Sequence, residues 1–273
     1  HVGAALTASQ SLGARARLRA NATFADLDSG YASAWGATFT ETRRGTARVQ
    51  ADWSAGSRLS LSGGAELLRE RARNTYIVGS SDAPIPIARE VAGSFAEIRY
   101  EDGGRLLVAA GLRAERIARD RLEGAPGGFP PRPDFTRDTV TSWNPKLSAS
   151  WMVRPMGPAG RASTRVKVNA GTGIRPPDAF EIAFTDNPGL KPERSRSVDV
   201  GLEQVLARGR AVVEATWFAN RYDDLIVAVG PAFADISRYR TDNISNARAR
   251  GLELAGAPRP PPGPPARRGG PPP

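Results

Sequence analysis

The sequence lacks cysteine entirely and contains one histidine, His1. Without cysteine, the chain has no disulfide framework, no thiolate nucleophile and no Cys-based metal site. Without a second histidine, Ser-His-Asp catalysis, Cys-His catalysis and ordinary His zinc sites are excluded. An enzyme would have to depend on Asp, Glu, Lys, Arg or Tyr alone. We therefore expect a protein that is not an enzyme and that has no catalytic residue, no metal site and no cofactor.

Long apolar runs are also absent. No stretch of about 18 apolar residues occurs, so the sequence predicts no transmembrane helix. A membrane β-barrel stays open as an interpretation, because its strands alternate between apolar and polar residues. The chain has neither an initiator Met nor a signal-peptide pattern, and we expect it to be a fragment.

Lysine is scarce. Only Lys146, Lys167 and Lys191 occur, so arginine supplies almost all of the net charge of +10. A basic chain raises the question of nucleic acid. The arginines are spread over the whole sequence, however, and no aromatic stacking platform accompanies them. We therefore expect no nucleic-acid partner and interpret the arginines as solvated or as facing a polar lumen.

The sequence is rich in period-two alternation, which is typical of β-strands. Residues 161–171, for example, alternate Arg, Ser, Lys and Asn with Ala, Thr and Val. Such runs predict ten strands and the start of an eleventh, at 3–9, 14–25, 44–54, 57–71, 91–101, 104–119, 139–153, 161–172, 194–206, 210–224 and 239–256.

The lengths of the connections indicate how these strands are arranged. Short turns are expected at 55–56, 102–104, 156–160 and 207–209, and long polar segments at 72–90, 120–138, 173–193 and 225–238. Outer-membrane barrels have all their short turns at one end, whereas a β-sandwich has mostly short loops at both ends. The predicted fold is all-β: an antiparallel, up-and-down transmembrane β-barrel, present here as an incomplete part of about 10–11 strands.

Three aromatic residues support a barrel. Trp53, Tyr100 and Trp151 each precede a short turn and belong to the apolar set of their strand. They predict an interfacial girdle on the convex, lipid-facing side, which should also carry Val166. The concave side should carry Arg48, Arg113, Arg165 and Glu203. We expect its arginines to be solvated or paired across strands, with partners such as Glu66, Glu115 and Asp52.

One motif covers residues 169–203, with key positions Gly171, Gly173, Arg175, Pro177, Phe180, Glu181, Asn187, Pro188, Leu190, Lys191, Pro192, Glu193, Ser195, Ser197, Gly201 and Glu203. Further positions are Phe218, Asn220, Asp224, Leu225 and Ile226, then Asn243, Ala247, Gly251 and Glu253. The first stretch resembles the GxGFRAPxxxELF…NPxLKPExSxxxExG segment in the barrel of TonB-dependent outer-membrane receptors, and the second resembles the strands that follow it. Pro176 stands where that family usually has Ala.

The resemblance implies a receptor and active transporter of the bacterial outer membrane. Its solute would be scarce and large, such as a ferric siderophore or cobalamin, and would bind to the extracellular loops. The partners would be membrane lipid and the TonB system, which acts through a plug domain missing here. The family's barrel has about 22 strands, so the chain would form its interior and C-terminal part. A passive porin-like or adhesin barrel and a soluble β-sandwich binding module are the alternatives.

The prolines of the motif predict how its loop behaves. Pro176, Pro177, Pro188 and Pro192 each fix φ near −65°, so the loop at 173–193 should be stiff for its length. We expect it at the end of the sheet opposite Gly56, Gly103 and Gly209. Its predicted role is to guide the chain back into the sheet rather than to bind the solute.

The C-terminal end differs in composition. Nine prolines occur among residues 257–273, and proline cannot donate to a strand ladder. We expect a partial barrel domain over 1–256 and a tail without fixed structure over 257–273. The tail can be a Pro-rich linker, but we favour a frameshift or assembly error in GC-rich coding, because the break falls in the middle of a strand.

Overall fold

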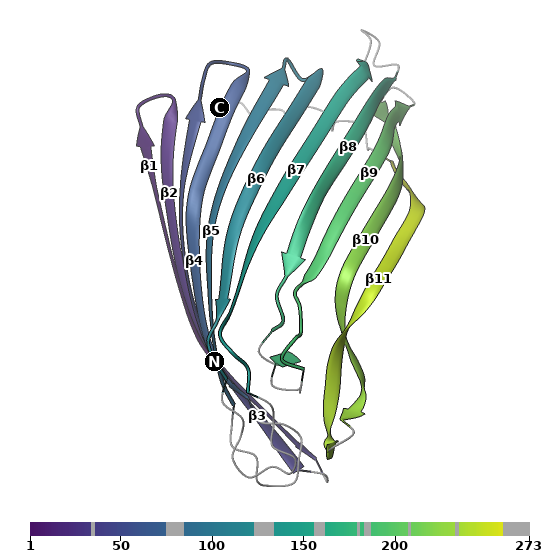
Figure 1. Ribbon diagram of the computed structural model, residues 1–273. Coiled ribbons are helices and arrows are strands. Elements are labelled where there is room, and N and C mark those ends of the chain that lie inside the picture. Colours follow the sequence, from purple (N-terminus) through teal and green to yellow (C-terminus); the bar gives the residue numbers. More distant parts are fainter. Residues whose placement is uncertain are drawn as a thin grey trace, which may run out of the picture.

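The computed structural model describes residues 1–33, 36–74, 85–122, 134–155, 162–178, 181–182, 187–206, 209–232 and 235–258. Within these residues, eleven strands form one sheet in sequence order (Figure 1). They are β1 (Val2–Leu12), β2 (Ala16–Ser33), β3 (Gly36–Ser54), β4 (Leu59–Asn74), β5 (Ile85–Asp102), β6 (Leu106–Arg119), β7 (Asp138–Arg154), β8 (Ser163–Arg175), β9 (Glu193–Leu206), β10 (Ala211–Ala232) and β11 (Asp235–Pro258). Every neighbouring pair is antiparallel, which confirms the predicted up-and-down fold. The described residues contain no second packed sheet, so the sandwich interpretation is wrong for them.

The strands run farther than the alternation predicted. β2 continues to Ser33 and β3 begins at Gly36, against predicted limits of 25 and 44. β10 and β11 leave only residues 233 and 234 between them, so the long polar segment predicted at 225–238 is wrong. The segment predicted at 72–90 is likewise strand at both ends. Backbone pairing holds a hairpin together whatever its side chains are, so it continues after the alternation ends.

The last strand also ends later than expected. Ala257 and Pro258 still pair with the start of β10, two residues past the predicted limit of 256. A proline at the end of a strand is tolerated, because its missing N–H interrupts no further ladder. Residues 259–273 lie outside the described residues, so the prediction that the tail has no fixed structure is not tested there.

Glycines at the short turns explain where the chain reverses. Gly13, Gly56, Gly103, Gly104 and Gly209 all have positive φ, between 49° and 109°, a conformation that other residues rarely adopt. They lie in the β1–β2, β3–β4, β5–β6 and β9–β10 connections, all at one end of the sheet (Figure 1). The β8–β9 loop lies at the opposite end, as predicted. The turn predicted at 156–160 falls outside the described residues.

The strand register divides the side chains between two faces. Directly paired residues share a face, and successive residues alternate between faces. The pairs Trp53–Leu61, Leu59–Tyr100 and Trp151–Val166 therefore belong to one face, which we call the outer face. The opposite face, the inner face, carries Arg48, Arg113, Arg165 and Glu203. This division confirms the predicted side-chain sets.

The β8–β9 loop folds back over the inner face. Its residue Ile182 forms a small buried core with Ile87 of β5 and with Leu122 and Phe135 from the β6–β7 connection. Arg89 of β5 also donates a hydrogen bond to the Pro177 carbonyl oxygen at 3.1 Å. A loop that joins β8 to β9 reaches β5 only by crossing the inside of the curved sheet. The inner face is therefore the concave one.

No helix in the described part of the chain is long and apolar enough to cross a membrane.

Candidate functional site

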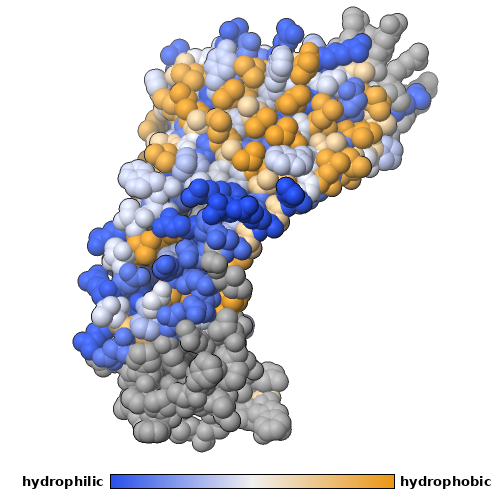
Figure 2. Space-filling model, turned by 45° about the vertical axis from the view of Figure 1, so that its right-hand side comes forward, coloured by the Kyte–Doolittle hydropathy of each residue, from blue (hydrophilic) through white to orange (hydrophobic). Residues whose placement is uncertain are grey.

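An apolar band covers the outer face near the short turns. It runs over nine residues in several strands: Gly45–Trp53 in β3, Leu59–Leu67 in β4 and Leu106–Ala114 in β6. Nine residues span about 26 Å along a strand at ~3.3 Å each, and about 20 Å of height at a tilt of ~40°. This matches the 9–11 residues of a membrane-spanning strand. Figure 2 shows apolar side chains gathered in the half of the molecule away from the long loops.

Large apolar side chains in this band are open to the surroundings. Trp53 is 49% exposed, Trp151 54% and Leu254 73%. Trp143 lies on the same face as Trp151 and eight residues away, about 26 Å at ~3.3 Å per residue. The two tryptophans of β7 thus mark both limits of the band. The sequence analysis missed Trp143, although its alternation with Trp151 in β7 was visible.

Ion pairs on the outer face mark the limit of the band in β2–β5 on the side away from the short turns. Arg43 pairs with Asp26 at 3.0 Å, and Arg69 pairs with Glu90 at 2.9 Å. Each pair joins directly opposite residues of neighbouring strands. Exposed pairs of this kind contribute little to stability, about 0–1 kcal/mol. Their value here is positional, because they show where the outer face changes from apolar to charged.

The inner face is polar and cross-linked. Arg113 of β6 contacts Glu66 of β4 and donates to Glu115 at 2.5 Å, so it reaches over β5. Gly93 of β5 lies below this bridge, where an added Cβ would come within 3.1 Å of the Arg113 guanidinium. Asn144 extends the network by donating to Glu115 at 3.2 Å. The pairing predicted for Arg113 is confirmed.

A second set of ion pairs on the inner face also crosses a strand at a glycine. Lys167 of β8 contacts Glu203 of β9 at 2.7 Å and Glu214 of β10 at 3.0 Å. Gly201 lies opposite Lys167 in β9, and an added Cβ there would lie 3.2 Å from Thr216 Oγ1. A glycine of the motif thus leaves space for a cation to cross a strand.

Aromatic rings cover two further glycines on the inner face. The Phe218 ring lies over Gly251, where an added Cβ would come within 2.9 Å of the ring. The Phe95 ring covers Gly64 in the same way, and the Arg48 guanidinium lies 4.5 Å above the centre of that ring. Stacking a ring on a strand glycine compensates for the missing side chain. The pairing of Phe218 with Gly251 explains why these two motif residues occur together.

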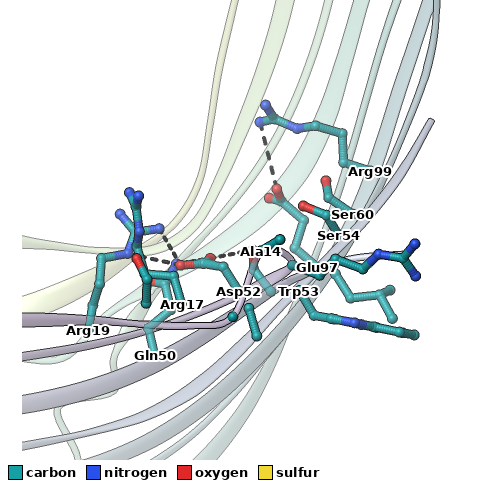
Figure 3. A pocket seen from close by; sticks show the side chains of 16 residues that line it. Ala14, Arg17, Arg19, Gln50, Asp52, Trp53, Ser54, Ser60, Glu97 and Arg99 are labelled. Atoms are coloured by element: carbon teal, nitrogen blue, oxygen red, sulfur yellow. Dashed lines mark hydrogen bonds and ion pairs between the residues drawn. The ribbon is translucent and has the colours of Figure 1, made fainter. Parts of the chain in front are cut away.

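A polar pocket lies at the short-turn end and is lined by residues from β1 to β5, including the β1–β2 turn (Figure 3). Asp52 is its centre and accepts hydrogen bonds from Arg19 at 2.5 and 2.9 Å, Gln50 at 2.7 Å and Ser62 at 2.7 Å. Glu97 and Arg99, which also line the pocket, are 3.8 Å apart. These groups satisfy one another, so the pocket has the character of a hydrated lumen wall.

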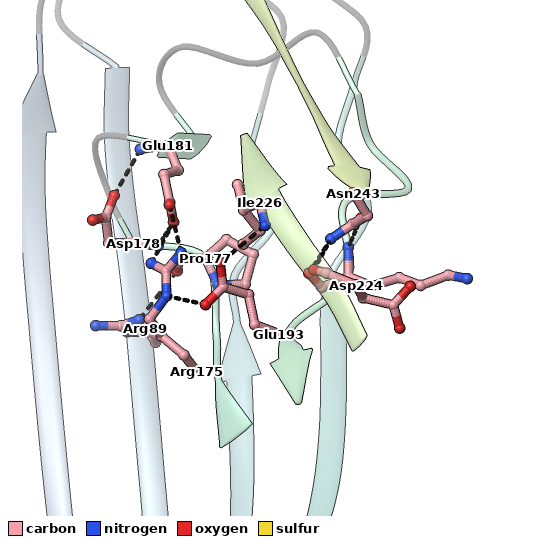
Figure 4. A network of polar contacts seen from close by, with 10 residues as sticks. Arg89, Arg175, Pro177, Asp178, Glu181, Glu193, Asp224, Ile226 and Asn243 are labelled. Carbon is pink, nitrogen blue, oxygen red and sulfur yellow. Dashed lines mark hydrogen bonds and ion pairs between the residues drawn. The ribbon is translucent and has the colours of Figure 1, made fainter. Parts of the chain in front are cut away.

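The motif residues of the β8–β9 loop form one hydrogen-bonded network, shown in Figure 4. Arg175, at the end of β8, donates twice to Glu193 at the start of β9, both at 2.6 Å. It also donates twice to Glu181, at 2.8 and 3.0 Å. Asp178 and Glu181 exchange backbone-to-carboxylate hydrogen bonds at 2.7 and 2.9 Å, the reciprocal pattern of a capping box. Arg175 therefore clamps both ends of the loop.

The same network continues into β10 and β11. Glu193 accepts a hydrogen bond from the Ile226 amide at 2.9 Å. Asn243 accepts from the Lys191 amide at 2.9 Å and donates to the carbonyl oxygens of Lys191 at 3.0 Å and Asp224 at 2.7 Å. Asp224 has a positive φ of 58°, which is uncommon for a residue other than glycine. Motif residues separated by 52 positions in sequence are thus joined directly.

Electrostatics keep Glu193 ionised. The hydrogen bonds from Arg175 lower the pKa of its carboxyl below the ordinary value, and the Ile226 amide lowers that pKa further, although burial opposes both. The same contacts with Glu193 and Glu181 raise the pKa of the Arg175 guanidinium. The clamp therefore carries fixed charges at any physiological pH.

The motif residues do not all belong to the clamp. Gly171 pairs with Lys146, Gly173 faces Ser195, and Asn220 and Glu253 line an inner-face groove with Lys167. Asn187 donates to Asp242 at 3.1 Å and accepts from the Gly189 amide at 3.0 Å. Phe180 lies outside the described residues. Pro188, Leu190, Pro192 and Leu225 lie beside these contacts in the loop and in β10.

Two contributors were missed from the sequence. Asp178 was detectable, because a carboxylate three residues before Glu181 is a capping-box spacing. Arg89 was not detectable, because its contact with the loop depends on how the chain crosses the sheet. That this loop guides the chain back into the sheet, and does not bind the solute, stays a prediction.

Comparisons with known proteins agree with this architecture. Residues 2–259 match the family model described as TonB dependent receptor-like, beta-barrel. No curated protein sequence matches the chain. Among solved structures, the chain is similar to the copper transporter OprC, with a TM-score of 0.71, 16% identity, and coverage of 93% of this chain and 43% of that one.

Two further solved structures show the same likeness. The FrpB iron transporter (F3-3 variant) from Neisseria meningitidis gives a TM-score of 0.66 at 15% identity, covering 94% of this chain and 40% of that chain. The alcaligin outer membrane receptor FauA from Bordetella pertussis gives a TM-score of 0.62 at 16% sequence identity, covering 90% of this chain and 41% of that chain. At such identities the likeness shows the fold. The chain spans less than half the length of each of these relatives.

Proposed function

Because this chain belongs to the TonB-dependent receptor β-barrel family, we propose that it forms part of the wall of a bacterial outer-membrane receptor that imports a scarce solute. The observation that carries this proposal is the division of the sheet into an apolar outer face and a polar, cross-linked inner face. An outer band of nine residues suits the hydrocarbon layer. The inner face suits a hydrated lumen.

The proposed solute is a metal chelate, with a ferric siderophore as the first candidate and cobalamin as the second. The similar solved proteins are described as a copper transporter, an iron transporter and an alcaligin receptor, which supports the metal-chelate class. Solute specificity would be determined by long loops at the end that carries the Arg175–Glu193 clamp. We propose that TonB drives import through a plug domain supplied by another part of the protein.

The clamp has a proposed structural role in this function. Arg175, Glu181 and Glu193 close the base of the β8–β9 loop, and Asn243 ties it to the β10–β11 hairpin. A loop fixed at its base holds any recognition surface above it in one position. Such preorganisation reduces the ordering cost of binding a solute.

Uptake in cells tests this proposal. The complete receptor containing residues 2–259 is expressed in cells that lack other siderophore receptors, with and without TonB, and uptake of labelled ferric siderophores and cobalamin is measured. We expect uptake of one class of solute that disappears without TonB. Diffusion of small sugars that is independent of TonB would instead support the passive porin alternative. Retention of uptake in Arg175→Ala despite a loosened loop would contradict the role given to the clamp.

A further inference from the structure

Each of the four short turns that contain a positive-φ glycine ends in an arginine. The β1–β2, β3–β4, β5–β6 and β9–β10 connections all place this arginine at the last position before the next strand. We call these four residues the turn arginines: Arg15, Arg58, Arg105 and Arg210. All four side chains are exposed. No other charged residue occurs among the described residues of these turns, which are 13–15, 55–58, 103–105 and 209–210.

Backbone hydrogen bonds hold three of the turn arginines at one level of the sheet. The carbonyl oxygens of Arg15, Arg58 and Arg105 accept hydrogen bonds from the amides of Ser54, Glu101 and Met152, at 2.8, 2.8 and 2.6 Å. Each bond joins the end of one turn to the final residues of β3, β5 or β7, so the reversals lie side by side. Two strands separate one turn from the next, a distance of about 10 Å at ~4.8 Å per strand.

The strand alternation directs these side chains away from lipid. Each turn arginine immediately precedes the first residue of β2, β4, β6 or β10, and that residue belongs to the outer face. Leu59, for example, follows Arg58 and is directly opposite Tyr100. Because successive residues alternate between faces, the turn arginines belong to the inner-face set. They therefore lie on the aqueous side of the wall, at the end that carries the short turns.

Few acids compensate for these charges. Arg58 pairs with Asp102, the last residue of β5, at 3.4 Å, and the two side chains are 64% and 44% exposed. Among the described residues, no acidic side chain forms an ion pair with the other three turn arginines. Glu101 is the only other acid within two residues of these turns, and Arg17 lies equally near. The short-turn end is therefore a positively charged rim, beyond the apolar side chains of the band (Figure 2).

The composition and spacing of the rim indicate the kind of partner. The described residues of the four turns are Gly, Ala, Ser and Arg only. Protein interfaces concentrate their binding energy in buried aromatic and apolar residues, so these turns do not suit a folded protein. Single charges at intervals of about 10 Å suit a flexible polymer that repeats an anionic group, because linked weak contacts reinforce one another.

We propose that the turn arginines bind peptidoglycan, the anionic polymer of the periplasm, through the free carboxylates of its peptides. Guanidinium groups suit this ligand, because each can donate two parallel hydrogen bonds to a carboxylate. Outer-membrane barrels have their short turns on the periplasmic side, so this inference rests on the membrane placement in the proposed function. The contact holds the receptor wall beside the cell wall and leaves the lumen free.

The test compares two triple variants of the complete receptor, purified in detergent. The turn variant replaces three turn arginines: Arg15→Gln, Arg58→Gln and Arg105→Gln. The control removes the same charge from exposed arginines of the outer face at the other limit of the apolar band: Arg43→Gln, Arg69→Gln and Arg73→Gln. Co-sedimentation is measured with purified peptidoglycan sacculi, with sacculi whose carboxylates have been amidated, and with phosphatidylglycerol vesicles.

We expect the wild type and the control to bind sacculi equally, and the turn variant to bind about tenfold more weakly, because three exposed ion pairs of modest strength are lost. Amidated sacculi should bind the wild type as weakly as intact sacculi bind the turn variant. Replacing the same three arginines with lysine keeps the charge and should recover part of the binding.

Three outcomes overturn the proposal. Equal binding of the turn variant and the wild type to sacculi shows that the turn arginines are not the contact. Undiminished binding of the wild type to amidated sacculi shows that carboxylates are not the ligand. Loss of vesicle binding by the turn variant, with sacculus binding intact, assigns the turn arginines to lipid.

A separate measurement distinguishes this failure from failure of the proposed function. A cysteine introduced as Ser57→Cys, in the β3–β4 turn, is treated with a membrane-impermeant maleimide in cells. Labelling only after the outer membrane is permeabilised shows that the turn faces the periplasm, and unaltered sacculus binding by the turn variant then refutes the peptidoglycan inference alone. Labelling in intact cells shows that the membrane placement itself is wrong, and with it the proposed function.

Discussion

Replacing Glu193 with alanine should open the base of the β8–β9 loop. Glu193 accepts two hydrogen bonds from Arg175 at 2.6 Å and one from the Ile226 amide at 2.9 Å. The Arg175 side chain is 46% exposed, so its share is near that of a surface pair, about 0.2–1 kcal/mol. The amide left without a partner adds about 1–3 kcal/mol. We expect a local loss of about 2 kcal/mol.

Hydrogen exchange measures this opening directly. A local loss of about 2 kcal/mol corresponds to roughly thirtyfold faster exchange at the Ile226 amide, because exchange reports the free energy of local opening. Glu193→Gln keeps an oxygen that can accept from Ile226 and should give an intermediate rate. Glu90→Ala removes an exposed acid of a distant ion pair and should leave Ile226 unchanged. Unchanged exchange at Ile226 in Glu193→Ala would refute the reasoning.

The same amide should respond to acid. Arg175 and the Ile226 amide lower the pKa of Glu193, so its folded-state pKa lies below the unfolded value of about 4.3. The stabilisation is therefore complete above about pH 4.3 and is lost as the pH falls through the folded-state pKa. After correction for the intrinsic rate, exchange at Ile226 should be constant from pH 7 to about 5 and accelerate below about 4. Acceleration between pH 7 and 6 would assign the effect to another group.

Two further substitutions have expected outcomes. Gly251→Ala should lower the free energy of unfolding in urea by about 1–3 kcal/mol, because the new methyl group would overlap the Phe218 ring. The control Gly256→Ala should change that free energy by less than about 1 kcal/mol, because the nearest atom to the new methyl group would be 3.9 Å away. Val200→Arg should reduce membrane assembly, because a charge near the middle of the apolar band costs about 2–4 kcal/mol. The control Asp199→Arg, on the inner face, should assemble normally. Heat-modifiable migration on gels measures assembly of both variants.

The parts of the fold that depend on local pattern could be predicted from the sequence. Alternation in β8 assigned Arg165 and Val166 to opposite faces, and the glycines at 56 and 103 located short turns. Neighbour pairing followed from the order of short and long connections. The extent of β2 and β10 could not be predicted, because backbone pairing continues where the side chains no longer alternate.

The contacts of the site could not be predicted from the sequence, because they depend on how the strands lie beside one another. Arg113 reaches Glu66 across Gly93, and no spacing in the sequence reveals that a glycine on the strand between them leaves the way open. The motif identified Arg175 and Glu193, but their bond depends on the register of β8 and β9.

The most direct test of the account is a cysteine scan along β9 in the complete receptor, in membranes. The chain has no cysteine of its own, so each variant carries a single reporter in this segment. Val198, Asp199, Val200, Gly201 and Leu202 are replaced in turn and labelled with an environment-sensitive fluorophore. The account predicts quenching by lipid-bound quenchers at 198, 200 and 202, and by aqueous iodide at 199 and 201. Uniform aqueous quenching at all five positions would contradict the membrane-facing outer surface, and with it the proposed receptor wall.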